Sequence, residues 1–139
     1  MNPIEYLQKI SSIFEFKTIL DDLNNEYVLF SNSVLKHVEN IDDRTAFEAV
    51  ENHVHLIDRV SKKHFDSCLS IAHVMGKTLL TSLEAQYPQR NFVVYVTVKE
   101  NDSMIIRFHQ KWNNEASYYD PSQFNSKYEV VVKYESKLG

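Results

Sequence analysis

The side chains in this chain that could do chemistry are six histidines, one cysteine and two adjacent pairs of acids. Protein metal sites typically have three or four converging ligands, and paired catalytic acids must face each other. The spacings typical of such sites are absent from the sequence. His53 and His55 lie two positions apart in a segment predicted to be helical, where their side chains point about 200° apart. They are therefore not expected to share a metal ion.

The other reactive residues do not predict catalysis either. Cys68 lies in an apolar stripe, which favours a buried, inert thiol over a nucleophile. Two glycines in 139 residues exclude the glycine-rich loops that cradle phosphates. The pairs Asp21–Asp22 and Asp42–Asp43 are interpreted as helix caps and solvated surface, because adjacent carboxylates diverge. The sequence predicts a protein that is not an enzyme, with no cofactor and no metal.

The most informative segment is residues 108–124, which holds the only tryptophan and four other aromatic rings in an otherwise polar stretch. Two interpretations stay open. The rings could cover the edge of a sheet and close a small second core. They could instead form a binding patch, since Trp, Tyr and Arg dominate the energetics of protein interfaces. The candidate partner-binding residues are Arg107, His109, Lys111, Trp112, Tyr118, Tyr119 and Phe124.

Charge is unevenly distributed along the chain. The net charge is −4, but the first 60 residues hold eleven acids and five bases, and the remainder carries a small positive excess. An acidic half argues against nucleic acid as a partner and is compatible with a basic protein, although a solvated helical face would look the same. No apolar run approaches the ~20 residues of a membrane span, and the start lacks a signal-peptide pattern. We expect a cytoplasmic protein.

These residues must be positioned by helices followed by strands. Apolar residues recur at three- and four-residue spacing through the first 88 positions, and Pro88 ends that pattern. The spacing then alternates over 92–99, 104–111 and 128–135, which predicts a hairpin and a third strand. The sequence therefore predicts a single α+β domain over 1–139, helical over residues 1–88 and forming a sheet over residues 89–139. Three or four N-terminal helices would pack on one face of a three-stranded antiparallel C-terminal sheet.

One tract resembles a known family. Ile105-Ile106-Arg107-Phe108-His109-Gln110-Lys111-Trp112, followed by Tyr118-Tyr119-Asp120, is similar to a segment of small immunity proteins, which bacteria encode beside polymorphic secreted toxins. This resemblance covers about twenty residues. It implies a cytoplasmic, non-enzymatic inhibitor that masks a toxin domain, and the acidic half would suit a basic toxin such as a nuclease.

Three functional hypotheses follow. The first is a protein-binding module, an immunity-type inhibitor of a toxin. The second is a small-molecule-binding or enzymatic domain with a pocket between sheet and helices, where Arg107, His109 and Tyr119 would be the polar contacts. The third is a structural protein that self-associates through an open sheet edge. No nucleic acid or membrane is expected as partner, and the chain would be a monomer or a homodimer.

Overall fold

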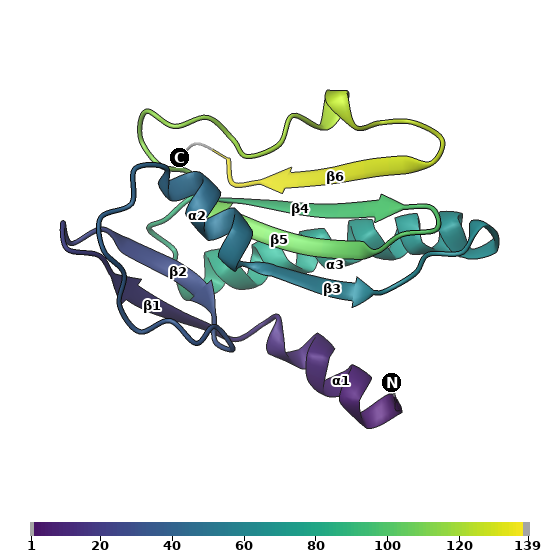
Figure 1. The fold of residues 1–139 in the computed structure, drawn as a ribbon, viewed down its shortest axis with the longest axis horizontal. Helices are drawn as coiled ribbons and strands as arrows, with labels where there is room; N and C mark the ends of the chain where they lie inside the picture. The colour runs from purple at the N-terminus through teal and green to yellow at the C-terminus, as the bar shows by residue number, and fades with distance from the viewer. Residues whose placement is uncertain (1, 138–139) are drawn as a thin grey trace.

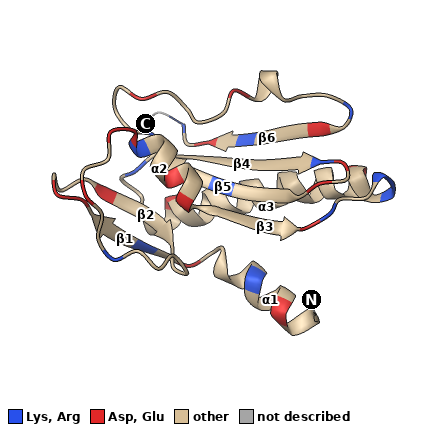
Figure 2. Cartoon of the chain, in the orientation of Figure 1, with Lys and Arg blue, Asp and Glu red and all other residues tan. Residues whose placement is uncertain are grey.

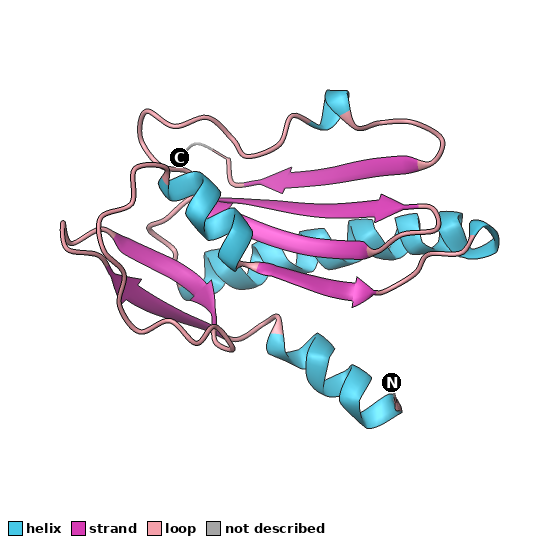
Figure 3. Ribbon diagram, in the orientation of Figure 1, coloured by secondary structure: helices cyan, strands magenta, loops and turns pink. Residues whose placement is uncertain are grey.

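The structure is a computed structural model that describes residues 2–137 of the chain (Figure 1). It contains three α-helices, six strands and two short 3-10 turns, all within that range (Figure 3). In chain order the elements are α1 (Pro3–Ser12), β1 (Phe16–Leu20), β2 (Glu26–Phe30), α2 (Arg44–Glu51), β3 (His53–Ile57), η1 (Lys62–His64), α3 (Phe65–Gln86), β4 (Phe92–Lys99), β5 (Met104–Gln110), η2 (Pro121–Gln123) and β6 (Glu129–Glu135).

The main layer is a four-stranded antiparallel sheet with the order β3-β5-β4-β6. The alternation after Pro88 predicted β4, β5 and β6, and the structure has these strands. Their inward residues, such as Val94, Val96 and Phe108, pack against the long helix α3, which lies across one face of the sheet (Figure 1). Gly76 lets this helix approach β6, because a Cβ at that position would stand 3.0 Å from the Tyr134 ring.

The chain is α+β, but the predicted arrangement of three or four helices on one three-stranded sheet is wrong, because the structure has two sheets, of two and four strands. Residues 16–20 and 26–30 form a separate two-stranded sheet instead of helices. Their apolar residues mimic a helical period because four consecutive positions of β2 are buried, so that strand shows no alternation. Asn24 makes the turn between the strands, with a left-handed φ of 63° that asparagine tolerates better than most residues.

The third unexpected strand, β3, joins the main sheet and makes it four-stranded. It was predicted to continue the helix that begins after Asp43, and that helix does begin there, with the Asp43 carboxylate accepting from the Ala46 N–H at 2.9 Å. The helix instead ends at Glu51, and Asn52 turns the chain into β3. The segment 1–88 is therefore not a helical unit.

Helix α1 begins as its sequence predicts. Asn2 and Glu5 form a reciprocal capping box, and Pro3 occupies the first turn. None of its residues is buried, but Tyr6 and Ile10 line a small apolar hollow together with Leu56 and Ile57 of β3 (Figure 1).

Two buried side chains, one from α2 and one directly after it, join the small sheet to the large one. The Glu48 carboxylate accepts four hydrogen bonds: from the Val28 N–H at 3.0 Å, from the backbone and side-chain N–H groups of Gln110 at 2.8 Å each, and from the Trp112 indole at 2.6 Å. One turn later, Asn52 accepts from the Phe30 N–H at 3.0 Å. Glu48 and Asn52 therefore accept hydrogen bonds from the N–H groups on the edge of β2 that does not pair with β1.

The same Asn52 also reaches the large sheet. Its amide donates to the Val28 carbonyl at 2.9 Å and to the Phe108 carbonyl at 3.4 Å, so one side chain bonds to β2 and β5. Burial raises the pKa of Glu48 to about 7, while its four N–H donors act in the opposite direction. The contact between the two sheets thus contains a carboxylate that is excluded from solvent but fully hydrogen-bonded.

We predict that Glu48→Ala lowers the free energy of unfolding by about 3 kcal/mol or more, because each buried donor left without an acceptor costs about 1–3 kcal/mol. Equilibrium urea unfolding measures the change. Glu51→Ala is the matched control on the same helix. It removes one hydrogen bond, from the Ser33 hydroxyl at 3.1 Å, and should cost about 1 kcal/mol. Equal losses in the two variants would contradict a central role for Glu48.

Candidate functional site

The aromatic residues after β5 lie in two separate places. Trp112, the first of them, packs in a small core beneath the two-stranded sheet, with its ring centroid 5.3 Å from that of Tyr27. Tyr27 in turn meets Phe47 of α2 at 5.0 Å. The Arg44 guanidinium lies 4.7 Å above the Trp112 ring. Trp112 therefore belongs mainly to the packing that holds α2 and β2 together.

The later rings cover the outer face of the large sheet, opposite α3. Tyr118, Tyr119 and Phe124 pack on three buried residues of that face, Val93, Tyr95 and Val131. The three covering side chains are half-buried. This arrangement matches the interpretation in which the rings close a small second core, while leaving part of each ring in contact with solvent.

Two backbone hydrogen bonds fasten this segment to the sheet. The Tyr118 N–H donates to Nε2 of His109, and the Tyr119 N–H donates to the Tyr95 hydroxyl, both at 3.3 Å. His109 is buried, and its Nδ1 lies 2.7 Å from the Gln110 carbonyl. Because a carbonyl only accepts, Nδ1 carries the proton and Nε2 is the acceptor. The segment therefore requires a neutral imidazole.

The electrostatic setting of His109 favours that neutral form. Burial lowers the pKa of the imidazole, and the nearby Lys133 lowers it further. The Gln110 carbonyl and the carboxylates of Glu115 and Asp43 act against that shift. The neutral ring that the hydrogen bonds need is thus the form present at neutral pH.

The two cationic candidates also have internal partners. The Arg107 guanidinium donates to the Ala49 carbonyl at 3.2 Å and lies 5.5 and 5.4 Å from the Tyr118 and Tyr119 rings. Lys111 donates to the Ser136 carbonyl at 2.8 Å. Of the seven predicted site residues, the structure brings together Arg107, His109, Tyr118, Tyr119 and Phe124. Lys111 and Trp112 lie beside this cluster, in a hollow that His109 also lines.

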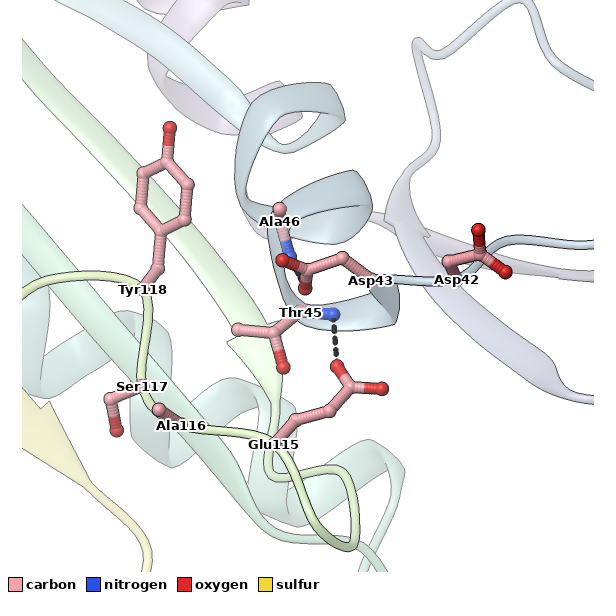
Figure 4. Close-up of a pocket in the computed structure, with 8 residues that line it drawn as sticks. All are labelled: Asp42, Asp43, Thr45, Ala46, Glu115, Ala116, Ser117 and Tyr118. Atoms are coloured by element: carbon pink, nitrogen blue, oxygen red, sulfur yellow. Dashed lines mark hydrogen bonds between the residues drawn. The ribbon is translucent and has the colours of Figure 1, made fainter.

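An open hollow lies beside this cluster, between the start of α2 and the segment after β5 (Figure 4). Its volume is about 570 Å³. One wall carries the exposed acids Asp42 and Asp43, and the other carries Glu115 and Tyr118. Figure 2 shows that acidic residues also occupy the neighbouring loops at this end of the molecule. Glu115 is already paired with Arg44 and Asp43 caps α2, so Asp42 is the carboxylate of this hollow that is exposed for a cationic side chain.

Glu115 builds the hollow by fixing one wall to the other. Its carboxylate accepts from the Thr45 N–H and from Arg44 Nε, both at 2.7 Å. It therefore caps the N-terminus of α2 from a position 70 residues further along the chain. Partial burial acts to raise the pKa of Glu115, but these hydrogen bonds outweigh it and the pKa is lowered. Glu115 is ionised at neutral pH.

The acids of the hollow were missed as a group by sequence reasoning. Asp43 was identified only as a helix cap, and Glu115 had no signal, because its role depends on a contact between distant segments. The available clue was the excess of acids in the first 60 residues.

The structure also changes the view of the histidines. The prediction that His53 and His55 point to opposite sides is wrong, because they lie on β3 and side chains two apart on a strand share a face. Within residues 2–137, no three His, Cys, Asp or Glu side chains gather in a way that could hold a metal ion.

Comparison with known proteins assigns the chain to a family. Residues 9–137 match the family described as "Uncharacterized protein PM0498 family", and the chain belongs to it. Neither the curated proteins nor the solved structures contain a match. Among the described residues, no helix has the length and apolar character needed to cross a membrane.

We predict that Trp112→Ala lowers the free energy of unfolding by about 3 kcal/mol, because it removes a packed ring and a donor to Glu48. Tyr128→Ala is the control in the same connection between β5 and β6, since that ring is 53% exposed and its loss should change stability by about 0.5 kcal/mol or less. Urea unfolding of both variants provides the comparison. A Trp112→Ala protein as stable as the wild type would show that the indole is not part of the core.

We predict that stability falls in acid partly through His109. Its folded-state pKa lies below the unfolded value of about 6.5, so the unfolded chain binds the proton first. This contribution is fully present above about pH 6.5 and declines as the pH drops toward the folded-state pKa. The free energy of unfolding of wild type and His109→Gln, measured across this range, should converge as the pH falls. A constant difference between the two proteins would contradict the prediction.

Proposed function

We propose that this chain is a non-enzymatic protein-binding module, an immunity-type inhibitor that acts in the cytoplasm and masks a basic toxin domain. The observation that carries the proposal is the acidic hollow bounded by Asp42, Asp43 and Glu115, with the Tyr118 ring on its rim. A tyrosine beside carboxylates is a typical setting for a buried Lys or Arg of a partner, because the ring packs on the alkyl stem while the acids meet the charge.

The position of the hollow supports the same function. It is bordered by the segment after β5, where the tract similar to immunity proteins continues with Tyr118-Tyr119-Asp120. Its walls are held in place before binding by the Glu115 contacts with Arg44 and Thr45. A preformed site loses less conformational entropy when a partner docks. The surrounding acids would also speed the encounter with a cationic protein.

The proposal predicts that Asp42→Lys weakens the complex with the toxin domain encoded beside this gene by about tenfold or more, because it places a cation where the partner's cation binds. Asp42 is exposed and lies outside α2, so the fold should be unchanged. Association and dissociation rates measured by biolayer interferometry at two salt concentrations test this, and the loss should be larger at low salt.

Asp58→Lys is the matched control. It makes the same charge change at an exposed position beyond the far end of β3 and should leave the affinity within about twofold. Equal weakening by both variants would indicate a general charge effect instead of a site. The absence of any complex tighter than the micromolar range with the neighbouring gene product would refute the proposed function.

A further inference from the structure

We propose that His53 and His55 form a surface site for one divalent transition-metal ion, such as Zn²⁺, Ni²⁺ or Cu²⁺. Both lie on β3, an edge strand of the large sheet, and both side chains are exposed. Their rings face the same side, with centroids 5.7 Å apart. Imidazole nitrogen is a preferred ligand for these three ions.

The spacing of the rings is close to what one shared ion requires. Two imidazoles that bind zinc at the usual distance of about 2.0–2.1 Å and at a tetrahedral angle place their ring centroids about 5 Å apart. The rings stand 5.7 Å apart and edge to face at 67°, so a shared ion requires the side chains to rotate until both Nε2 atoms point to it.

The hydrogen bonds at Nδ1 of each ring bear on whether Nε2 is available to bind a metal ion. His53 Nδ1 lies 2.5 Å from the Val50 carbonyl, so Nδ1 must carry the proton. His55 Nδ1 lies 3.2 Å from the Ser103 hydroxyl, which can donate or accept and also lies 3.5 Å from the Asp58 carbonyl. Nε2 of His53 is therefore left with a free electron pair. This is the outer hydrogen bonding that metal-binding histidines usually show.

The charges around the pair leave room for a cation. Arg107 is the residue opposite His53 in the register of β3 and β5. Its guanidinium is directed to the Ala49 carbonyl and to the Tyr118 and Tyr119 rings. Two protein ligands leave at least two positions of a tetrahedral shell for water. Binding should therefore be weaker than at a site with three or four protein ligands.

The test is isothermal titration of the full chain with zinc chloride at neutral pH. Wild type should bind one ion per chain, and His53→Ala and His55→Ala should each weaken binding by about tenfold or more. Ser103→Ala, which removes the hydrogen-bond partner of His55 Nδ1, should weaken binding several-fold. His64→Ala changes an exposed histidine elsewhere and should bind as wild type does.

Protonation gives an independent readout. Histidine binds a metal ion only through an unprotonated nitrogen, so zinc binding should be weaker in acidic buffer than at neutral pH. A wild-type titration without saturable heat would overturn the proposal. So would undiminished binding in both His53→Ala and His55→Ala, which would place the zinc elsewhere on the surface.

Discussion

A single buried carboxylate determines how the halves of this molecule fit together. Glu48 is removed from water, and burying a charge is strongly unfavourable unless its hydrogen-bonding capacity is met. Four N–H donors from β2, β5 and Trp112 meet it. Because those donors come from both sheets, the carboxylate is satisfied only when the sheets stand in one relative position. Asn52 adds a second fixed point one turn later.

The position of α2 follows from that constraint, and the candidate site follows from the position of α2. With Glu48 and Asn52 anchored on one side of the helix, its N-terminus is presented to the segment after β5. Glu115 bonds there, and the gap that remains is the acidic hollow. The proposed binding surface is therefore formed by two segments that are held by contacts deep in the structure.

Sequence patterns predicted the second half of the fold far better than the first. Helix α3 and strands β4 to β6 are long elements with a clear period, and the structure has them where the patterns indicate. Strands β1 to β3 have only five residues each, and β2 is buried on both sides. Their apolar residues therefore fit a helical spacing as well as a strand, and only tertiary pairing decides between the two.

The same limit applies to the candidate site. The aromatic segment stood out in the sequence because rings are rare in polar stretches. Which rings would be buried could not be read from it, since Trp112 and Tyr118 differ only in the surfaces they meet. Glu115 and Asp42 are ordinary surface acids in sequence, and the hollow exists because the fold brings distant segments of the chain to one place. His53 and His55 were likewise predicted to point apart on a helix, and they share a face because they lie on a strand.

The cap that Glu115 supplies to α2 has a consequence for synthesis of the chain. The N-terminal part of a chain leaves the ribosome first, so β1, β2 and α2 emerge well before Gln110, Trp112 and Glu115. These later residues are the hydrogen-bond partners of α2. The small sheet and α2 therefore cannot complete these hydrogen bonds until the β4–β5 hairpin, which follows α3, has been synthesised. Nascent chains stalled before residue 110 would hold an unassembled first half, and this half would be the region that depends on chaperones during translation.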